Sequence, residues 1–323
     1  MFKRILARLG ALALILNLTC VGCSKQNTEI SKSGTYFDTV ITITLYEDSP
    51  KILDGCFALA QKYDNYFSTT TPSSDIAKIN SHAGEFVTVH AETRKLIEKS
   101  LYYSEITDGN FDITVGHLSD LWKKAIKTHT VPNPSAIQRA KSSVDYRKIE
   151  ISGDKIKIAS DQALDLGGIA KGYIADRIKE YLNSQGIKSG LINLGGNIYA
   201  MSKKPNGESY TIGIKKPFTN TNEAFDSVTV TNTSVVTSGN YERYFKQNDT
   251  IYHHIIDLKT GYPCQNDLNS VTIISDKSID GDALSTSLFL LGEKDSQKVI
   301  DHFKNLEVRF INKDNQESIL RSR

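Results

Sequence analysis

Strand-like and helix-like segments follow one another irregularly along the chain, and this order most constrains its fold. Residues 39–46 alternate β-branched and apolar side chains as a strand does, and apolar residues recur at helical spacing from Ile52 to Phe67. A second helix is predicted for residues 91–107, and residues 111–115 have an extended pattern. Further strand-like runs follow without a helix between each pair: 148–151, 155–158, 191–193, 210–214, 227–231, 234–237, 252–256, 271–274 and 308–311. A doubly wound parallel sheet needs regular alternation, so the order predicts an α+β fold with mixed or antiparallel sheets and packed helices.

The length and composition fit an ordinary globular protein. With 323 residues, of which 39% are hydrophobic, the chain can bury the core of one large domain or two moderate ones. No internal repeat or break in composition marks a boundary between domains. The composition therefore excludes wholesale disorder and repeat arrays.

The N-terminus has the pattern of a secretory signal peptide. Three cations, Lys3, Arg4 and Arg8, precede an apolar run over residues 9–18, and small residues follow the run. The run is too short to cross a hydrocarbon core of about 30 Å as a helix. We therefore expect residues 1–22 to be a signal peptide that is removed.

The signal peptide ends at a candidate lipid attachment site. Val21-Gly22-Cys23 resembles the lipobox of bacterial lipoproteins, in which the Cys becomes the lipidated first residue. We expect Cys23 to anchor the exported protein to the outer face of the cell membrane, with residues 23–33 as a polar tether and residues 34–323 as the folded domain. Cleavage without lipidation is the alternative. A redox pair of Cys20 and Cys23 is disfavoured by its place at the end of a secretory segment.

The charge of the mature chain argues against a nucleic-acid partner. Removal of the signal peptide takes away three cations and no acid, and it changes the net charge from +2 to −1. No basic cluster of the kind that binds nucleic acid remains. Apart from Cys23, the mature chain contains only Cys56 and Cys264, enough for one disulfide at most.

A glycine-rich turn, Asp-Leu-Gly-Gly-Ile-Ala-Lys-Gly at residues 165–172, opens a predicted helix. Apolar residues at helical spacing follow it, from Tyr173 to Leu182. Glycines let the backbone approach a ligand, a helix start presents unpaired N–H groups, and Lys171 adds a cation; together these features suit a pyrophosphate. A tight turn with an exposed Lys is the alternative, since the segment is neither a Walker A loop nor a Rossmann fingerprint.

Asp282 and Thr286 are candidate magnesium ligands. A helix is predicted to begin near residue 280, which places the two side chains one turn apart on the same face. Magnesium commonly takes such hard oxygen ligands together with phosphates and water. An Asp that only caps the start of its helix is the alternative.

His253 and His254 lie in the predicted strand 252–256 and should therefore point to opposite faces. A His can take a proton from an attacking hydroxyl, and His254 shares its face with Ile256. A structural His pair is the alternative. No Cys or second His lies at the spacing of a zinc site.

These segments, in this order, resemble the FAD:protein FMN transferase (ApbE) family over nearly the whole mature chain. The other segments that carry the resemblance are 37–39, 67–80, 109–112, 194–197, 237–239 and 254–261. The resemblance implies an α+β, T-fold-like architecture of the ApbE type for a flavin transferase domain at residues 34–323, and many members are exported lipoproteins. The chain departs from the common pattern at Asp38, where many members have Gly, at Thr70, where many have an aromatic residue, and at Leu258, where Pro is usual.

The resemblance also implies the roles of individual residues. FAD, the substrate, would be held by Phe37, Asn110, Phe111, Asp112, Asp165, Lys171 and the backbone near Ile256. Magnesium would be bound by Asp282, Ser285, Thr286 and a carbonyl group near Gly168. His254 would be the catalytic base.

The implied reaction is attack by a Thr or Ser hydroxyl of another protein on the FMN phosphorus of FAD, which expels AMP. With water in place of the hydroxyl, the same site would be an FAD pyrophosphatase, and a non-enzymatic flavin-binding surface lipoprotein is a third hypothesis. The family's acceptor motif is an Asp followed by Ser or Thr, a small residue, Ala, and Ser or Thr, and this chain has no good copy of it. The acceptor is therefore expected to be another exported or membrane protein that carries the motif.

Overall fold

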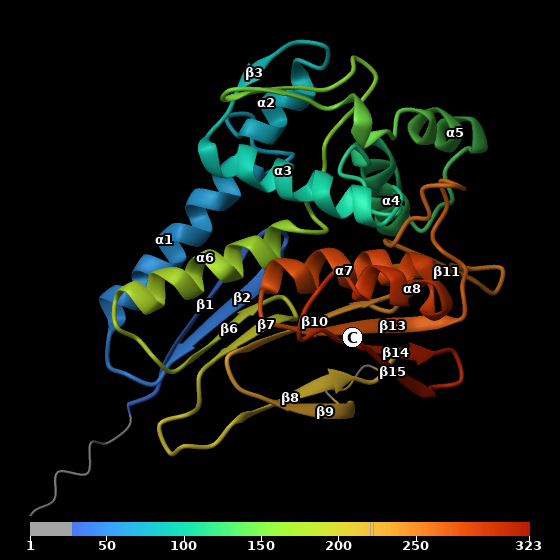
Figure 1. The fold of residues 1–323 in the computed structure, drawn as a ribbon. Coiled ribbons are helices and arrows are strands. Elements are labelled where there is room, and N and C mark those ends of the chain that lie inside the picture. Colours follow the sequence, from blue (N-terminus) through green and yellow to red (C-terminus); the bar gives the residue numbers. More distant parts are fainter. Residues whose placement is uncertain (1–27, 220, 222) are drawn as a thin grey trace, which may run out of the picture.

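An eight-stranded antiparallel sheet, in the order β1-β2-β6-β7-β10-β13-β14-β15, forms the centre of the fold (Figure 1). The computed structural model describes residues 28–219, 221 and 223–323. The strands are β1 Ile30–Tyr36, β2 Thr39–Leu45, β3 Val87–Thr88, β4 Glu150–Ser152, β5 Lys155–Lys157, β6 Gly190–Leu194, β7 Asn197–Met201, β8 Tyr210–Lys215, β9 Ala224–Val230, β10 Thr233–Gly239, β11 Tyr244–Gln247, β12 Thr250–His253, β13 Leu268–Ser275, β14 Glu307–Asn312 and β15 Glu317–Arg321. The helices are α1 Pro50–Phe67, α2 Asp75–Ser81, α3 Ala91–Ile106, α4 Gly116–Thr128, α5 Pro134–Ser142, α6 Ala170–Ser184, α7 Ser278–Leu291 and α8 Glu293–Ile300, with a 3-10 turn at Tyr146–Lys148.

Strand β2 forms where the alternation of side chains predicts it. Ile41, Ile43 and Leu45 are fully buried, and the threonines between them are only partly buried. Strand β1 pairs with β2 along its whole length. Strand β1 begins at Ile30, within the segment 23–33 that was expected to be the tether, and it forms an edge of the sheet through backbone pairing without apolar alternation.

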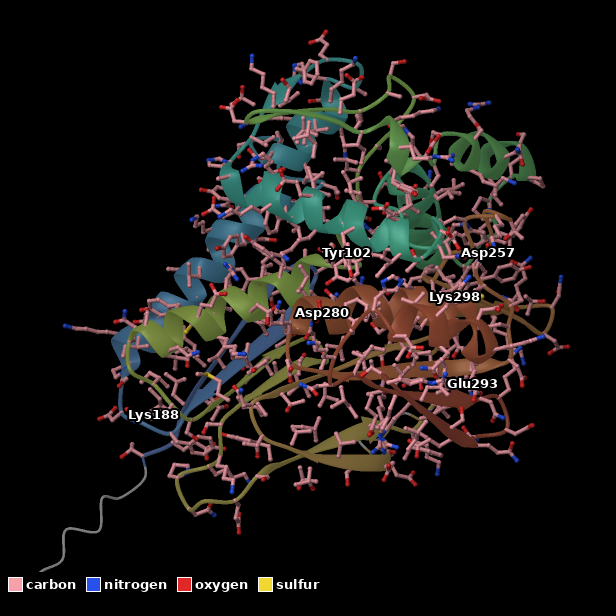
Figure 2. All side chains as sticks on the ribbon, viewed as in Figure 1. Tyr102, Lys188, Asp257, Asp280, Glu293 and Lys298 are labelled. Atoms are coloured by element: carbon pink, nitrogen blue, oxygen red, sulfur yellow. The ribbon has the colours of Figure 1, made fainter. Side chains whose placement is uncertain are left out.

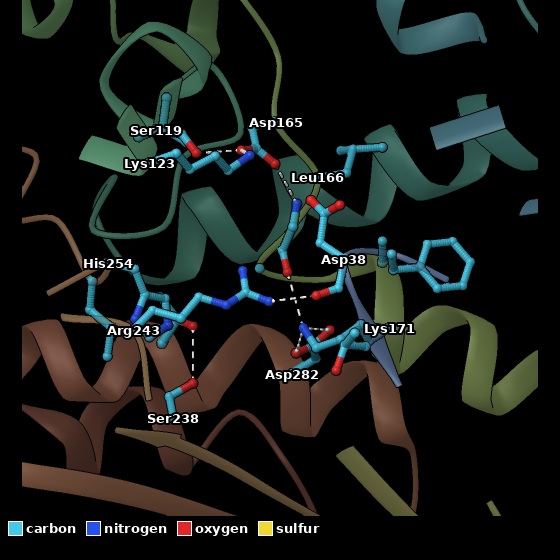
Figure 3. A pocket seen from close by; sticks show the side chains of 18 of the residues that line it. Asp38, Ser119, Lys123, Asp165, Leu166, Lys171, Ser238, Arg243, His254 and Asp282 are labelled. Atoms are coloured by element: carbon cyan, nitrogen blue, oxygen red, sulfur yellow. Dashed lines mark hydrogen bonds and ion pairs between the residues drawn. The ribbon is translucent and has the colours of Figure 1, made fainter. Parts of the chain in front are cut away.

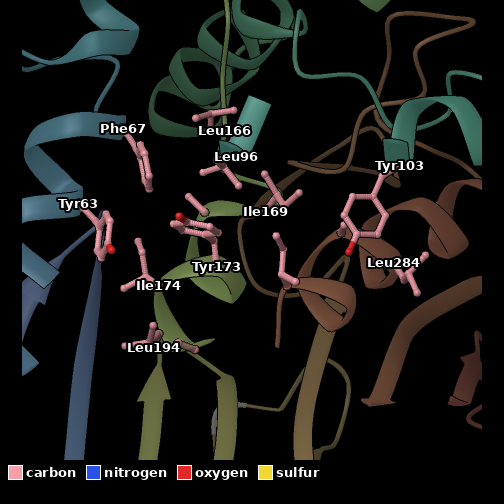
Figure 4. Close-up of a cluster of buried hydrophobic side chains, with 14 of the residues drawn as sticks. Tyr63, Phe67, Leu96, Tyr103, Leu166, Ile169, Tyr173, Ile174, Leu194 and Leu284 are labelled. Carbon is pink, nitrogen blue, oxygen red and sulfur yellow. The ribbon is translucent and has the colours of Figure 1, made fainter. Parts of the chain in front are cut away.

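Helices cover one face of the sheet and a hairpin covers the other (Figure 1). On the helical face, the aromatic residues Tyr63 and Phe67 of α1 pack with Tyr173 of α6 above Leu194 of β6 (Figure 4). On the other face, the β8–β9 hairpin packs through a separate apolar cluster that includes Ile212. The predicted α+β class is confirmed, and all pairs between the named strands are antiparallel.

A second, mainly helical layer of α2 to α5 and the small sheet β3-β5-β4 lies above these helices (Figure 1). Trp122 of α4 is fully buried, and its Nε1 donates a hydrogen bond to the carbonyl oxygen of Gly261 at 2.8 Å. Tyr103 of α3 donates from its hydroxyl to Asp280 of α7 at 2.5 Å, and Figure 2 shows Asp280 beneath α3. Side-chain contacts thus fix this layer over α7 and over the segment that follows β12.

Two carboxylates join α6 and α7 at their N-termini. Asp176 of α6 accepts hydrogen bonds from the backbone N–H groups of Ser278 and Ile279, at 2.9 and 3.0 Å, and Asp282 of α7 accepts one from Gly172 at 2.9 Å. Neither helix has a side-chain cap at its own N-cap residue, so each helix satisfies the first N–H groups of the other. Gly172 permits the close approach, because a Cβ there would lie 2.3 Å from the carbonyl oxygen of Ser278.

The structure differs from the predicted pattern at residues 111–115 and at the end of strand β12. Residues 111–115 form no strand, because the carboxylate of Asp112 accepts hydrogen bonds from the N–H and hydroxyl of Thr114, at 2.8 and 2.7 Å, and bends the segment into a turn. Strand β12 ends at His253, three residues before the predicted end. Cys56 and Cys264 are both free, so they form no disulfide.

Candidate functional site

A cavity of about 1030 Å³ lies between α6 and α7 on one side and the upper helical layer on the other (Figure 3). It brings together most of the residues that the sequence singled out: Phe37, Asn110, Phe111, Asp112, Asp165, Gly168, Lys171, His254, Ile256, Asp282 and Thr286. Ser285 does not line the cavity, and Cys23 lies outside the described residues. One chamber therefore combines groups from both ends of the domain.

Lys171 lies at the start of α6, where it contacts the carboxylate of Asp282. Its Nζ donates to Asp282 Oδ1 at 3.0 Å and to the carbonyl oxygen of Gly167 at 3.1 Å. The two side chains are only 25% and 6% exposed, so the alternative of a tight turn with an exposed Lys is wrong. A shielded cation beside a helix N-terminus is an arrangement that binds phosphate groups.

Oxygen atoms of α7 and β10 gather beside this ion pair. Because α7 begins at Ser278, Asp282 lies in its second turn, and the alternative that Asp282 caps its own helix is wrong. Thr286 follows one turn later, and its Oγ1 lies 3.3 Å from Oγ of Ser238. Ser285 is fully buried, and its hydroxyl donates to the carbonyl oxygen of Asp282 at 3.0 Å. The predicted ligand Ser285 thus does not line the cavity itself, but its hydroxyl lies 2.8 Å from Oγ of Ser238, which does.

The donors in this region suit a hard cation. In the described part of the chain, no three His, Cys, Asp or Glu side chains form a metal-binding group. The carboxylate of Asp282 and the hydroxyl of Thr286, both on the cavity wall, are nevertheless oxygen ligands of the kind magnesium takes when substrate phosphates and water complete its shell. Without Cys or His among them, these side chains do not form the site of a softer metal.

The two adjacent histidines have different environments. His253 is fully buried; its Nε2 donates to the carbonyl oxygen of Cys264 at 2.8 Å and its Nδ1 accepts from the Ile255 N–H at 3.2 Å. His254 lines the cavity, and its buried Nδ1 has no hydrogen-bond partner among the described residues. Burial, with contributions from His253 and Arg243, lowers the pKa of His254 to about 3, so its imidazole is neutral at pH 7. Of the two histidines only His254 lines the cavity, although strand alternation is not the reason, since β12 ends at His253 and Ile255 lines the cavity as well.

Asp165 lies opposite the Lys171–Asp282 pair, at the roof of the cavity (Figure 3). Its Oδ2 accepts hydrogen bonds from the hydroxyl of Ser119 and, at 2.9 Å, from Nζ of Lys123, while its Oδ1 accepts one from the Gly167 N–H at 2.8 Å. Burial acts to raise the pKa of Asp165, but Lys123 and these hydrogen bonds outweigh it and lower the pKa. Asp165 is therefore a carboxylate over the whole physiological pH range.

The cavity lining also contains residues that were not predicted from the sequence, among them Ser119, Lys123 and Arg243. The first two lie on α4, whose buried Leu118, Trp122 and Ala125 recur at helical spacing and could have indicated the helix. No sequence signal indicates that α4 faces Asp165, because the pairing joins residues 42 positions apart.

The segment Asn110 to Asp112 forms one wall, and its polar groups are already partly engaged. Asn110 Nδ2 donates to the carbonyl oxygen of Thr107 at 2.7 Å. Besides the bonds from Thr114, Asp112 accepts one from the Tyr146 N–H at 2.8 Å, and burial raises its pKa. Phe111 is buried, with 5% of its surface exposed. A Cβ added at Gly168 would lie 3.3 Å from the Phe111 ring. Asp112 therefore holds the loop in shape while it lines the cavity.

Comparisons with known proteins identify the relatives of this chain. The sequence profile of the ApbE family matches residues 37–310. The chain belongs to the ApbE family. A FAD:protein FMN transferase of Klebsiella pneumoniae is 35% identical over 301 residues, which cover 92% of this chain and 93% of that protein. A FAD:protein FMN transferase of Treponema pallidum is 31% identical over an alignment that covers 94% of this chain and 90% of that protein.

Solved structures of ApbE proteins share the fold. The ApbE protein of Thermotoga maritima is similar with a TM-score of 0.81 at 30% identity, covering 91% of this chain and 97% of that chain. The flavinyl transferase ApbE of Pseudomonas stutzeri, in its apo form, has a TM-score of 0.79 at 25% identity, with 92% and 95% covered. These matches confirm the family, the ApbE-like architecture and the transferase class expected from the sequence.

A departure from the common ApbE pattern is accommodated at the β1–β2 turn. Phe37 and Asp38 have left-handed backbones, with φ of 54° and 55°. Gly is favoured in this conformation because it lacks a Cβ, and Asp is among the residues that tolerate it best. The Phe37 N–H donates to Asp64 Oδ1 at 3.3 Å, which holds the turn against α1. Asp38 thus keeps the turn that places Phe37 at the cavity.

The Lys123–Asp165 pair predicts a pH-dependent stability. The pKa of Asp165 is lowered and that of Lys123 is raised, so the pair stabilises the fold from about pH 4 to about pH 10, between the unfolded-state pKa values of the two groups, and its contribution disappears as acid protonates Asp165. We expect Lys123→Met to lower the free energy of unfolding by about 1–2 kcal/mol at pH 7, a value reduced for the 45% exposure of Lys123.

Urea denaturation at pH 7 and pH 3.5 measures this difference. The gap between wild type and Lys123→Met should shrink at the lower pH. Lys124→Met, which removes the neighbouring exposed cation, is the control and should change little at either pH. An equal loss in both variants, or a gap independent of pH, would show that the pair does not stabilise the fold.

Proposed function

We propose that this ApbE protein cleaves FAD and esterifies the FMN half onto a Thr or Ser hydroxyl of an exported or membrane protein, releasing AMP. The chain belongs to the ApbE family, and Lys171 at the start of α6 lies beside Asp282 in its cavity. This pairing of a cation and a carboxylate at a helix N-terminus supports the proposal. The relatives named above are FAD:protein FMN transferases. Lys171 and the positive end of the α6 dipole attract the diphosphate, since both offer positive charge to an anion, although the Gly172 N–H itself is already bonded to Asp282.

Asp282 and Thr286, with a carbonyl group near Gly168, are the residues that would hold magnesium. The bound ion would neutralise negative charge on the diphosphate. Asp165 at the roof and Phe37, Asn110 and Phe111 at the walls hold the remainder of FAD. In this arrangement the chain mainly positions FAD and stabilises charge, which is the larger part of catalysis in phosphoryl transfer.

His254 takes the proton of the attacking hydroxyl. A neutral imidazole is required for this step, and the low pKa of about 3 keeps His254 neutral in the free enzyme. The diphosphate anion, once bound nearby, raises the pKa of the imidazole and makes it a better proton acceptor. The base thus becomes effective when FAD is in place.

The direct test is incubation of the purified protein with FAD, magnesium and a peptide that carries the acceptor motif. Mass spectrometry should find a flavin-bearing peptide together with AMP. Free FMN and AMP without modified peptide would indicate an FAD pyrophosphatase, and unchanged FAD would indicate simple binding.

Asp282→Asn tests the metal site while retaining an oxygen for the Gly172 N–H. We expect at least a hundredfold loss of transfer and loss of the magnesium dependence of FAD binding, measured by calorimetry with and without magnesium. Asp280→Asn, on the same helix but outside the cavity lining, is the matched control and should keep both. Activity that persists in excess chelator would contradict the role of the metal.

His254→Ala should reduce the rate of transfer by about 100- to 10,000-fold and leave FAD affinity nearly unchanged, because a base acts on the transition state. His253→Ala should retain the rate but lower the melting temperature, since it removes a buried side chain with two hydrogen bonds. Single-turnover flavinylation at saturating FAD, beside an FAD titration, separates the two. A slow His253→Ala enzyme and a fast His254→Ala enzyme would reverse the assignment.

Export and lipid attachment at Cys23 remain part of the proposal. Within residues 28–323, apart from 220 and 222, no helix is long and apolar enough to cross a membrane. We expect wild type in the membrane fraction and Cys23→Ala unlipidated and released from it, as checked by fractionation and mass spectrometry of the N-terminus. Identical fractionation of the two proteins would refute the anchor.

A further inference from the structure

The rim of the cavity beside His254 carries an exposed cation and two exposed aromatic rings. Arg243 and Tyr244 line the cavity, and both are exposed. Phe218 stands outside it and packs edge-on against Tyr244, with ring centroids 5.4 Å apart. Phe218 and Tyr244 are each 39% exposed, which is uncommon for large aromatic side chains that serve only the core. We call these three residues the rim.

Arg243 differs from the other two cations of the cavity. Lys123 is paired with Asp165 and Lys171 with Asp282. Among the described residues no carboxylate pairs with Arg243, whose Nη2 donates only to the carbonyl oxygen of Asp38, at 3.3 Å. A guanidinium has five N–H donors in a planar fork that matches a carboxylate, so most of this capacity is unused.

The acidic groups near the rim do not satisfy Arg243. Glu242 precedes it, but its carboxylate lies 3.7 Å from Nζ of Lys215 and is balanced by that cation. Asp38 offers Arg243 its carbonyl oxygen and not its carboxylate. The guanidinium of Arg243 therefore has no carboxylate partner among the described residues and can pair with an acidic group from outside the chain.

Arg243 is held at a fixed place relative to His254. The carbonyl oxygen of Arg243 accepts a hydrogen bond from the His254 N–H at 3.2 Å, and the β11–β12 pairing continues from Tyr244 opposite His253. A hydroxyl bound beside the imidazole therefore lies near Arg243, because both residues line the cavity and their backbones are hydrogen-bonded. A carboxylate a residue or two from that hydroxyl can then reach Arg243.

We propose that the rim is the docking surface for the acceptor polypeptide, with Arg243 pairing with a carboxylate next to the acceptor hydroxyl and Phe218 and Tyr244 packing against its apolar neighbours. This inference rests on the proposed transferase function and adds the determinant by which the enzyme selects its protein substrate. Arg243 is thus a specificity residue for the acceptor, and the diphosphate of FAD is bound by Lys171 and the start of α6.

The test compares two peptides that differ only in an Asp or an Asn next to the acceptor Thr. With the wild-type enzyme, the KM for the Asp peptide should be at least tenfold lower than for the Asn peptide. Arg243→Gln should raise the KM for the Asp peptide to that of the Asn peptide, while the Kd for FAD stays within twofold. Arg243→Glu should reverse the preference in favour of a Lys peptide.

Matched variants separate the rim from general effects of charge. Lys246→Gln removes an exposed cation of the same hairpin that does not line the cavity, and it should keep the preference for Asp. Tyr244→Ser should raise the KM for both peptides alike, because packing does not depend on the charge of the peptide.

The outcomes distinguish this inference from the proposed function. If wild type modifies both peptides equally well, or if Arg243→Gln keeps the preference, the inference is wrong and the transferase function stands. If Arg243→Gln instead weakens FAD binding tenfold or more, Arg243 belongs to the diphosphate site and the inference is again wrong. A wild-type enzyme that modifies neither peptide under conditions where it consumes FAD overturns both.

Discussion

The rest of the site depends on reciprocal capping, in which a carboxylate of α6 binds the first N–H groups of α7 and a carboxylate of α7 binds an N–H near the start of α6. Asp176 and Asp282 each accept hydrogen bonds from the first N–H groups of the other helix, so neither helix start can shift without the other. The same Asp282 carboxylate also fixes Lys171. One side chain thereby links helix capping, helix packing and the placement of a cation at the cavity.

The lysine and arginine side chains of the cavity are of two kinds, paired and unpaired with a carboxylate. Two ion pairs, Lys123 with Asp165 and Lys171 with Asp282, lie on opposite sides of the chamber, and Arg243, which has no carboxylate partner among the described residues, lies between them in Figure 3. Internal pairs hold their partners in place and add little net field, whereas an unpaired cation attracts anions over a longer range. Under the proposal made above, the two paired cations keep fixed positions in the cavity, and Arg243 is the cation that remains able to pair with an acidic group of the acceptor.

The sequence was most informative where local periodicity and turn chemistry decide the structure. The alternation of β2, the helical stripe of α1 and the glycine turn before α6 were all predicted, and most of the predicted site residues line one cavity. The rest depended on tertiary contacts that no local pattern encodes. Asp112 bends an apparently extended segment. Ser285 is absent from the cavity lining and instead hydrogen-bonds to Ser238, which lines it. The position of Lys123 opposite Asp165 likewise follows from how α4 packs through Trp122.

The absence of a side chain at Gly172 also determines how the site can move. With the backbones of α6 and α7 in contact there, rotation or sliding of one helix against the other would bring the Ser278 carbonyl into the path of the α6 backbone. Helices α6 and α7 therefore behave as one rigid unit at this point of the cavity wall. A substitution that adds a side chain at position 172 would separate the two helices and displace Asp282 and Lys171 together, so this glycine sets the dimensions of the site without contacting any ligand.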